Sequence, residues 1–316
     1  MKKYVYIILI IIFPLLSVAQ NENVGTSGFS FLKVNYSARA AAMGNAYTGL
    51  SNDADAVFFN PAGLVQVKSP QASLTYMSYL IGINCGSATF VYPSNDKTTF
   101  AVFTKGLSAT EDRTIADEMG QFDGIDGTFG ISDFIFGLSA ARYLFDMLDI
   151  GVNAKFIQET LDDNSASAVI FDAGLMHQST NKYLKIGVAI KNIGKQLTYY
   201  TDNEYEENIP TTLTVGFSYH PREQLYATAD IYKPLDNDIF GRFGVEYQVH
   251  SLLALRAGYK TNASDWATGG NNDIYSGISF GAGFDLSKYN LMMDYAIVSY
   301  GDLGFVNQIS VKYFFK

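Results

Sequence analysis

The chain has a single cysteine, little charge for its length and, beyond its first residues, no long hydrophobic run. Cys85 has no second cysteine to pair with, so no internal disulfide holds the fold, and we interpret it as a small apolar strand residue. Charged residues make up 17% of the chain, against about 25% in soluble domains. No later segment approaches the roughly 18 apolar residues of a membrane helix, so a membrane-spanning fold here must be a closed β-barrel.

Basic residues are also scarce relative to acidic ones. The net charge of −9 disfavours nucleic acid as a partner, because phosphate binding needs a basic patch. Three histidines are far apart in sequence, and no nucleophile, base and orienting group can be assembled with them, so we expect neither an enzyme nor a cofactor. They are His177, His220 and His250. Asp53 and Asp55 lack the further oxygen ligands that calcium requires, so capping and turn formation is the preferred interpretation and no metal site is expected.

The N-terminus has the pattern of a secretory signal peptide. Lys2 and Lys3 precede an apolar run from Tyr4 to Leu16, and small residues follow up to Ala19. The run of about 13 residues is too short, as a helix, to cross a hydrocarbon core of roughly 30 Å. We therefore expect cleavage near Ala19, export across the inner membrane and a final location in the cell outer membrane.

Period-two alternation provides the main evidence for fold class. Leu213, Val215 and Phe217 alternate with small polar residues, as expected of a strand with lipid on one side and a filled lumen on the other. Aromatic residues reach 15% of the chain, which suits the aromatic belts of a membrane barrel. We predict an all-β transmembrane antiparallel barrel of about 14 strands. The expected strands are 71–81, 83–93, 97–107, 129–144, 148–160, 166–178, 182–193, 211–221, 223–233, 239–250, 252–261, 276–286, 288–299 and 304–315.

The connections between these strands separate by parity. Those after even strands are short, whereas those after odd strands include the long segments 108–128, 194–210 and 262–275. Short periplasmic turns and long external loops are typical of outer-membrane barrels. Much of the acid lies in these segments and in Asp162 and Asp163, so the acidic residues are expected to face outside. The acidic residues of the first long segment are Glu111, Asp112, Asp117, Glu118, Asp123 and Asp126, and others lie between Asp202 and Glu207.

The segment before the first strand is neither strand-like nor disordered in composition. Residues 38–43 form helices readily, Ser37 can cap such a helix and Gly44 can end it. A turn follows at residues 60–63, where Pro61 fixes its own dihedral angle and Gly63 is free to take a positive one.

Within this segment, FLKVNYSARAAAMGNAY followed by NDADAVFFNPAGL is similar to the PorV/PorQ family, a branch of the FadL-like outer-membrane barrels found in bacteria with type IX secretion. The resemblance implies a fourteen-stranded barrel at residues 71–316, with residues 20–70 tucked inside as a plug after the 1–19 signal peptide. Asn45 stands where a second glycine is common. The plug and its junction with the wall are expected to involve Arg39, Gly44, Asp53, Asp55, Asn60 and Pro61.

Charged residues on the polar faces of the strands are candidates for the lumen. One hypothesis makes them a permeation path; the preferred one makes them an ion-paired lining that holds the plug, because a buried charge must be paired or hydrated. The candidates are Lys155, Asp172, Lys185, Lys191, Asp230, Arg242, Glu246, Arg256, Lys260 and Asp294.

Two functions of different classes follow, besides contact with outer-membrane lipid. The resemblance implies a non-enzymatic barrel whose external rim docks secreted cargo or components of type IX secretion. The alternative is a transporter of small hydrophobic molecules, which should show an apolar pocket between plug and wall; Phe58, Phe59, Met43 and Tyr47 are its expected lining. Trp266 is interpreted as an interfacial anchor or loop contact before a binding residue. The identity of cargo or ligand, conduction through the lumen and the oligomeric state are left open.

Overall fold

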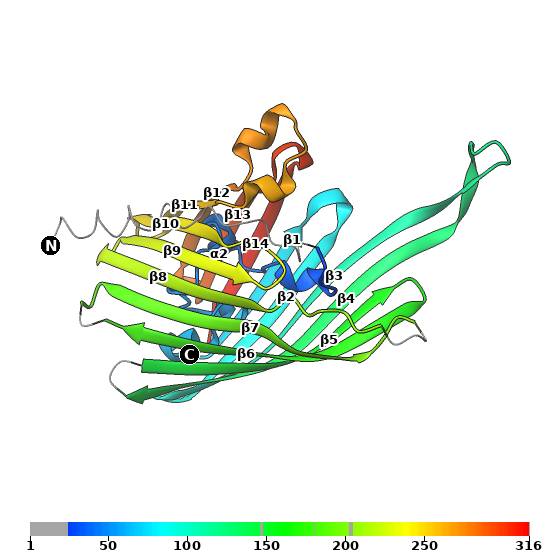
Figure 1. The fold of residues 1–316 in the computed structure, drawn as a ribbon. Coiled ribbons are helices and arrows are strands. Elements are labelled where there is room, and N and C mark those ends of the chain that lie inside the picture. The colour runs from blue at the N-terminus through cyan, green and yellow to red at the C-terminus, as the bar shows by residue number, and fades with distance from the viewer. Residues whose placement is uncertain (1–24, 146–147, 180, 202–204, 316) are drawn as a thin grey trace.

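A computed structural model describes residues 25–145, 148–179, 181–201 and 205–315. The predicted signal peptide lies outside these residues. Fourteen strands form one closed antiparallel barrel, in which each strand pairs with its neighbours in sequence and β14 pairs with β1 (Figure 1). The predicted fold class is confirmed, and closure leaves no sheet edge without hydrogen-bond partners.

The strands run as follows: β1 Gln71–Ser78, β2 Asn84–Asn95, β3 Thr98–Ala116, β4 Phe122–Phe145, β5 Leu148–Leu161, β6 Asn164–Gln178, β7 Leu184–Thr198, β8 Thr212–Arg222, β9 Leu225–Pro234, β10 Phe240–His250, β11 Leu253–Lys260, β12 Ile278–Leu286, β13 Leu291–Ser299 and β14 Phe305–Phe314. The single α-helix among the described residues is α2, Ala38–Ala42, and the short 3-10 helices are η2 Ser30–Lys33, η3 Ala54–Phe58, η4 Pro61–Gln66, η5 Leu80–Gly82, η6 Ala263–Trp266, η7 Asn271–Tyr275, η8 Ser287–Tyr289 and η9 Gly301–Leu303. None of the described helices is both long and apolar enough to span a membrane.

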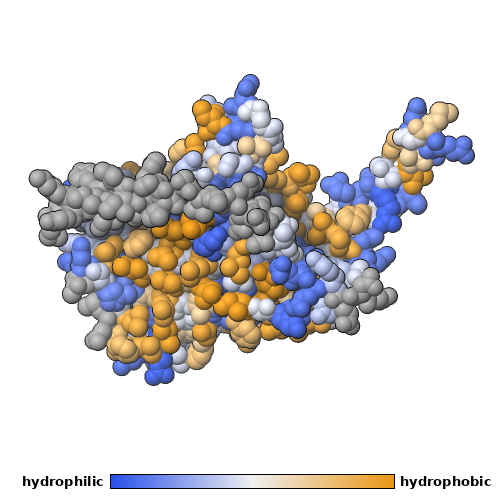
Figure 2. Space-filling view, in the orientation of Figure 1, coloured by the Kyte–Doolittle hydropathy of each residue, from blue (hydrophilic) through white to orange (hydrophobic). Residues whose placement is uncertain are grey.

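The outer surface of the barrel is apolar, and the inner surface is polar. In β8, Leu213 and Phe217 are exposed on the outside, whereas Thr214 and Ser218, the residues that follow them, are buried. The same alternation recurs around the wall, so that apolar residues cover most of the barrel face seen in Figure 2. Exposed apolar side chains over a whole barrel would be costly in water and are favourable in lipid.

The first predicted long loop is wrong. Residues 108–128 do not form an irregular connection: β3 and β4 continue as a paired ladder to Ala116 and Phe122, with a turn of residues 117–121 between them. This hairpin projects well beyond the barrel (Figure 1). Both of its faces meet solvent, so the ladder forms without the hydrophobic alternation from which the other strands were predicted. Two register shifts, near Arg113 and between Ile115 and Ala116, also interrupt its period.

The second predicted long loop is shorter than expected. β7 extends to Thr198, five residues past its predicted end at 193, and the connection to β8 covers residues 199–211. The extension follows shortly after Asn192, which has φ of 61° at the point where the pairing with β6 shifts. A bulge of this kind breaks the two-residue period, which is why the alternation ends early in the sequence.

Residues 25–70, which we call the inner segment, lie inside the barrel (Figure 1). Helix α2 packs against β11, β12, β13 and β14, and η4 packs against β3, β4, β5 and β6. The core of the protein is therefore formed by the inner segment and the inner wall together, with Phe29, Tyr36, Met43, Tyr47 and Phe59 fully buried. These apolar side chains are shielded from both lipid and water.

Local signals fix the shape of the inner segment. The Ser37 hydroxyl accepts a hydrogen bond from the Ala40 amide and caps α2, as predicted. The chain leaves the helix through Gly44 and Asn45, with φ of 63° and 59°, and Asn45 takes this conformation at the position where a second glycine was expected. Gly63 does not use a positive φ; a Cβ there would lie 1.9 Å from the Ser51 carbonyl oxygen, so close packing requires the glycine.

Candidate functional site

Glycines line the inner wall wherever the inner segment touches it. The backbone at Gly44 packs so closely on β11 that a Cβ at Gly258 would lie 2.0 Å from the Gly44 nitrogen. A Cβ at Gly216 would lie 2.6 Å from the Gly49 nitrogen, and one at Gly151 would lie 2.3 Å from the Ala62 nitrogen. We call the following set the glycine belt: Gly151, Gly174, Gly187, Gly216, Gly244, Gly258 and Gly281. The belt lets two backbones meet without intervening side chains.

A buried ion cluster joins the inner segment to the last strand. The Lys312 ammonium lies 2.6 Å from an Asp53 oxygen and 3.0 Å from an Asp55 oxygen, and all three side chains are buried. Asp53 also caps η3 by accepting the Asp55 amide hydrogen bond, and Asp55 accepts hydrogen bonds from Ser37 and Ser73. The pair therefore forms caps and turns, as preferred from sequence, and also binds the wall.

Arg39 extends this cluster to the opposite strands. Its guanidinium makes two hydrogen bonds of 2.8 and 2.7 Å to Glu246 on β10 and lies 3.3 Å from Asp53. Glu246 is shared with Arg256 at 2.6 Å, and Arg256 reaches Asp294 at 2.7 Å. Bidentate arginine pairs are the strongest charge-assisted contacts available here, so this chain of ion pairs fixes α2 against three strands.

The remaining predicted plug residues also contact the wall. The Gly44 amide donates to Ser279, and the Asn60 side-chain amide donates to the carbonyl groups of Thr48 and Leu175. Pro61 begins η4 and lies against Gly151 in the glycine belt.

The other lumen candidates fall into two groups. Some serve the inner segment or its surroundings: Asp230 accepts the Tyr47 and Thr48 amides, Lys155 pairs with Asp172 at 2.6 Å, and Lys185 donates to Gln66. A second group has no carboxylate in contact among the described residues. It comprises Lys191, Arg242 and Lys260.

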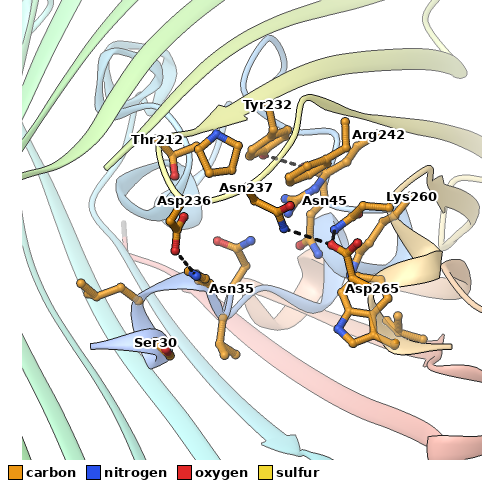
Figure 3. Close-up of a pocket in the computed structure, with 18 of the residues that line it drawn as sticks. Ser30, Asn35, Asn45, Thr212, Tyr232, Asp236, Asn237, Arg242, Lys260 and Asp265 are labelled. Carbon is orange, nitrogen blue, oxygen red and sulfur yellow. Dashed lines mark hydrogen bonds and ion pairs between the residues drawn. The ribbon is translucent and has the colours of Figure 1, made fainter. Parts of the chain in front are cut away.

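This second group lines one cavity of the described chain. The cavity has a volume of about 410 Å³ and lies between the inner segment and the strands. It is at one end of the barrel, and the start of β1 at Gln71 and the end of β14 at Phe314 are at the other. We call this the outer cavity. Figure 3 shows Tyr232, Arg242 and Lys260 converging on it from three neighbouring strands, with Asn35 and Asn45 of the inner segment facing them.

Aromatic rings hold the cations of the outer cavity. Arg242 lies 3.8 Å from the centre of the Tyr232 ring, and that ring stacks on Phe240 at 5.3 Å. Lys260 lies 5.7 Å from Trp266 and 5.5 Å from Tyr300, two rings that contact each other at 5.0 Å. Burial raises the pKa of the Tyr300 hydroxyl, so this residue stays neutral. Aromatic faces thus flank Arg242 and Lys260, and the cavity lining, with four cations against Asp236 and Asp265, carries net positive charge.

Sequence analysis predicted only some of the residues that line this cavity. Lys191, Arg242 and Lys260 were predicted to face the lumen, but their shared cavity and its aromatic walls were not predicted. Trp266 is a loop contact, as preferred from sequence, and also lines the cavity. The expected transporter lining does not form it: Met43, Tyr47 and Phe59 lie in the core, and Phe58 lines a separate cavity of about 20 Å³. No group of three or more metal-binding side chains occurs among the described residues.

Lys312 was missed although its signal was present. Its neighbours in the last strand, Val311 and Tyr313, point to the apolar face, so the alternation places Lys312 on the polar face, as it does the lumen candidates. Tyr232 and Tyr300 could not be found in this way, because alternation alone does not distinguish an inward aromatic residue from one in an interfacial belt.

Comparison with solved structures supports the fold. The toluene transporter TodX of Pseudomonas putida aligns with a TM-score of 0.61 and 13% identity over 88% of this chain and 96% of that one. The monoaromatic hydrocarbon channel CymD gives 0.61 and 13%, covering 89% and 98%, and a Pseudomonas aeruginosa FadL homologue gives 0.57 and 14%, covering 95% and 99%.

Sequence comparison adds no family assignment: neither a protein-family model nor a curated protein sequence matches the chain. The solved structures support the FadL-like part of the predicted resemblance, whereas the PorV/PorQ part is not shown. TodX is named as a transporter and CymD as a channel, and at these identities the likeness establishes the fold alone. The chain therefore shares the barrel fold of TodX, CymD and the FadL homologue.

Proposed function

We propose that the protein lies in the cell outer membrane and admits small hydrophobic molecules through the outer cavity. The observation that carries this proposal is the cavity itself, a space of about 410 Å³ between the inner segment and the barrel wall, lined by aromatic rings together with polar and charged side chains. Ligand pockets of small molecules have roughly 300–1,000 Å³ and are walled mainly by apolar and aromatic side chains. The apolar outer face of the barrel and its likeness in fold to the toluene transporter TodX and the hydrocarbon channel CymD also support this proposal.

Between the outer cavity and the end of the barrel at Gln71 and Phe314, the inner segment fills the lumen. The glycine belt and the buried ion pairs of Arg39 and Lys312 hold that segment against the wall. A continuous water-filled pore is therefore not expected, and a ligand that occupies the outer cavity moves on only when part of the inner segment shifts. Inner-segment residues 32–35 line the cavity and are the first candidates for such a shift.

Uptake by cells tests this function. A bacterial strain without hydrocarbon channels of its own, expressing the chain in its outer membrane, should accumulate labelled toluene faster than the same strain with an empty vector. An unrelated outer-membrane barrel expressed to the same level controls for membrane damage. Equal uptake by all three strains would refute the proposal.

Docking of secreted proteins or type IX secretion components is the second candidate, and one feature favours it. The β3–β4 hairpin projects beyond the barrel and carries most of the acidic residues of the predicted first loop. Apolar side chains, including Ile115, Met119, Phe122 and Ile125, are exposed on it. Gentle detergent extraction followed by affinity purification should recover a secreted or outer-membrane partner with the full chain and lose it when the hairpin is shortened. Recovery of the same partner without the hairpin would reject this role.

A further inference from the structure

Two cations face each other in the outer cavity without an acidic partner. Arg242 on β10 and Lys260 on β11 are directly opposed in the strand pairing, and their side chains are 8% and 5% exposed. Two nitrogens of Arg242, Nε and Nη1, have no hydrogen-bond partner among the described residues. Like charges directly opposite one another destabilise a sheet, and a buried charge without a partner costs more. The arrangement is unfavourable unless something else completes it.

Other buried cations of the wall and inner segment show the usual solution. Arg39, Arg256, Lys155 and Lys312 each have a carboxylate oxygen within 3.3 Å. Lys105 is buried without a carboxylate in contact, and its ammonium instead donates to the Val34 carbonyl group and lies over the Tyr36 ring. The sequence can therefore supply acidic partners inside this barrel. Their absence at Arg242 and Lys260 distinguishes the outer cavity from the ion-paired lining that holds the inner segment.

None of the described acids near this pair makes an ion pair with Arg242 or Lys260. Asp230, opposite Arg242 on β9, accepts hydrogen bonds from the amides of Tyr47 and Thr48 with one carboxylate oxygen, and its other oxygen has no hydrogen-bond partner among the described residues. Asp236 pairs with Lys33, and Asp265 accepts hydrogen bonds from two asparagine side chains. Lys191, the third cation of the cavity, adds further positive charge and donates to the Phe58 carbonyl group. The cavity thus has an excess of positive charge that the neighbouring side chains do not balance.

The walls indicate what kind of anion fits. Flat rings surround both cations: Tyr232 and Phe240 at Arg242, and Trp266 and Tyr300 at Lys260. Aromatic faces bind another ring by offset or edge contacts, and they offer nothing to a small hydrated ion. The guanidinium presents a planar fork of donors that matches a carboxylate.

We propose that the outer cavity binds a small aromatic carboxylate. Its carboxylate accepts hydrogen bonds from Arg242 and Lys260, and its ring lies against the aromatic walls beside them. This inference rests on the proposed function and deepens it, because it names the class of molecule that the cavity prefers. A neutral hydrocarbon of the same shape would contact the same rings and leave the two cations unbalanced, so it should bind more weakly.

The chain contains its own reporter for this site. Trp266 is the only tryptophan, and it lines the outer cavity beside Lys260. Titration of the full protein, purified from outer membranes in detergent, with benzoate should change the tryptophan fluorescence in a saturable way. Toluene and inorganic phosphate are the matched probes, since each has only one half of the chemistry. We expect benzoate to bind at least about tenfold more tightly than either probe, the ratio that a charge-assisted hydrogen bond supplies.

Variants separate the two parts of the account. Arg242→Met and Lys260→Met should each weaken benzoate binding about tenfold or more and leave toluene binding nearly unchanged. Lys185→Met is the matched control, because Lys185 donates to Gln66 and does not line this cavity. Arg242→Lys keeps the charge and should retain part of the affinity, which covers the case in which Arg242→Met does not fold. Folding of every variant is checked by the mobility shift of the unheated barrel on electrophoresis.

Three results would overturn the inference. Toluene that binds as tightly as benzoate, with no effect of the Met variants, would leave the hydrophobic channel intact and reject the anionic ligand. Phosphate that matches benzoate would reject the aromatic ligand in favour of a simple anion site. Absence of any fluorescence response, with all variants folded, would count against this inference and against the outer cavity as the entry of the proposed channel.

Discussion

The Nζ atom of Lys312 in the last strand lies 2.6 Å from an Asp53 carboxylate oxygen in the inner segment, across a sequence separation of 259 residues. The contact joins the inner segment to the last strand inside the closed barrel. Neither residue is more than 7% exposed, so the pair is a structural connection and not a surface ion pair.

Removing this lysine should loosen the inner segment. Lys312→Met leaves Asp53 and Asp55 buried without their main cation, and breaking a buried pair costs about 3–5 kcal/mol. We expect a lower Tm in thermal unfolding in detergent, followed by the heat-dependent mobility shift. Lys288→Met, at an exposed position in η8, should leave Tm unchanged. The double variant Lys312→Met with Asp53→Asn should recover part of the lost Tm. If Lys312→Met alone has the same Tm as the native protein, the role given to this pair is disproved.

The glycine belt makes a second prediction. Gly258→Ala places a Cβ against the Gly44 nitrogen at 2.0 Å, so the inner segment must move away from the wall. Looser packing should raise the ion conductance of the protein in a planar bilayer and its sensitivity to protease. Gly86→Ala is the control, because its Cβ would meet nothing nearer than 3.6 Å. Unchanged conductance in both variants would show that the glycine belt does not determine how closely the inner segment packs against the wall.

The lipid-facing surface can be tested by depth. Val245 and Val249 are both exposed on the outer face of β10, Val245 near the middle of the strand and Val249 near its end. Arginine costs about 2–4 kcal/mol at the bilayer midplane and about 0–1 near the interfaces. Val245→Arg should therefore lower the free energy of unfolding in lipid vesicles, measured by denaturant titration, much more than Val249→Arg. Equal effects would contradict the membrane position assigned to the barrel.

The β3–β4 hairpin should be dispensable for the fold. Residues 111–129 pair in the ladder only with each other, and their side chains are mostly exposed on both faces. Arg113 also forms an ion pair with Asp162 in the turn after β5, but an exposed pair of this kind contributes little to stability. Replacing residues 113–125 by a two-residue turn should leave the Tm of the barrel and its content of β-structure, followed by circular dichroism, unchanged. A large fall in Tm would mean that the hairpin contributes to barrel closure.

The sequence was sufficient for the barrel because its physical constraints are local. Lipid on one face and a filled lumen on the other impose an alternation such as that of Leu213 to Tyr219, and this alternation was enough for the number of strands. It failed at residues 108–128, where both faces of the hairpin are in water and no alternation is imposed. It failed again at Asn192, where a bulge changes the parity of β7.

The site was harder to predict because it depends on positions that only the closed barrel brings together. Arg242 and Lys260 could be assigned to the lumen from parity, but their opposition depends on the register of β10 and β11. Tyr300 and Trp266 lie in connections, where no periodicity places a side chain. The glycine belt was present in the sequence as scattered glycines, and only the path of the inner segment gives them a common role.

The most direct test of the proposed function is toluene uptake by cells that carry a filled outer cavity. Thr212 lines the cavity at the start of β8, and Thr212→Trp should occupy the space without removing an ion pair. With equal amounts of folded barrel in the outer membrane, the account predicts uptake above background for the native protein and uptake near background for Thr212→Trp. Equal uptake by the two proteins would contradict entry through this cavity.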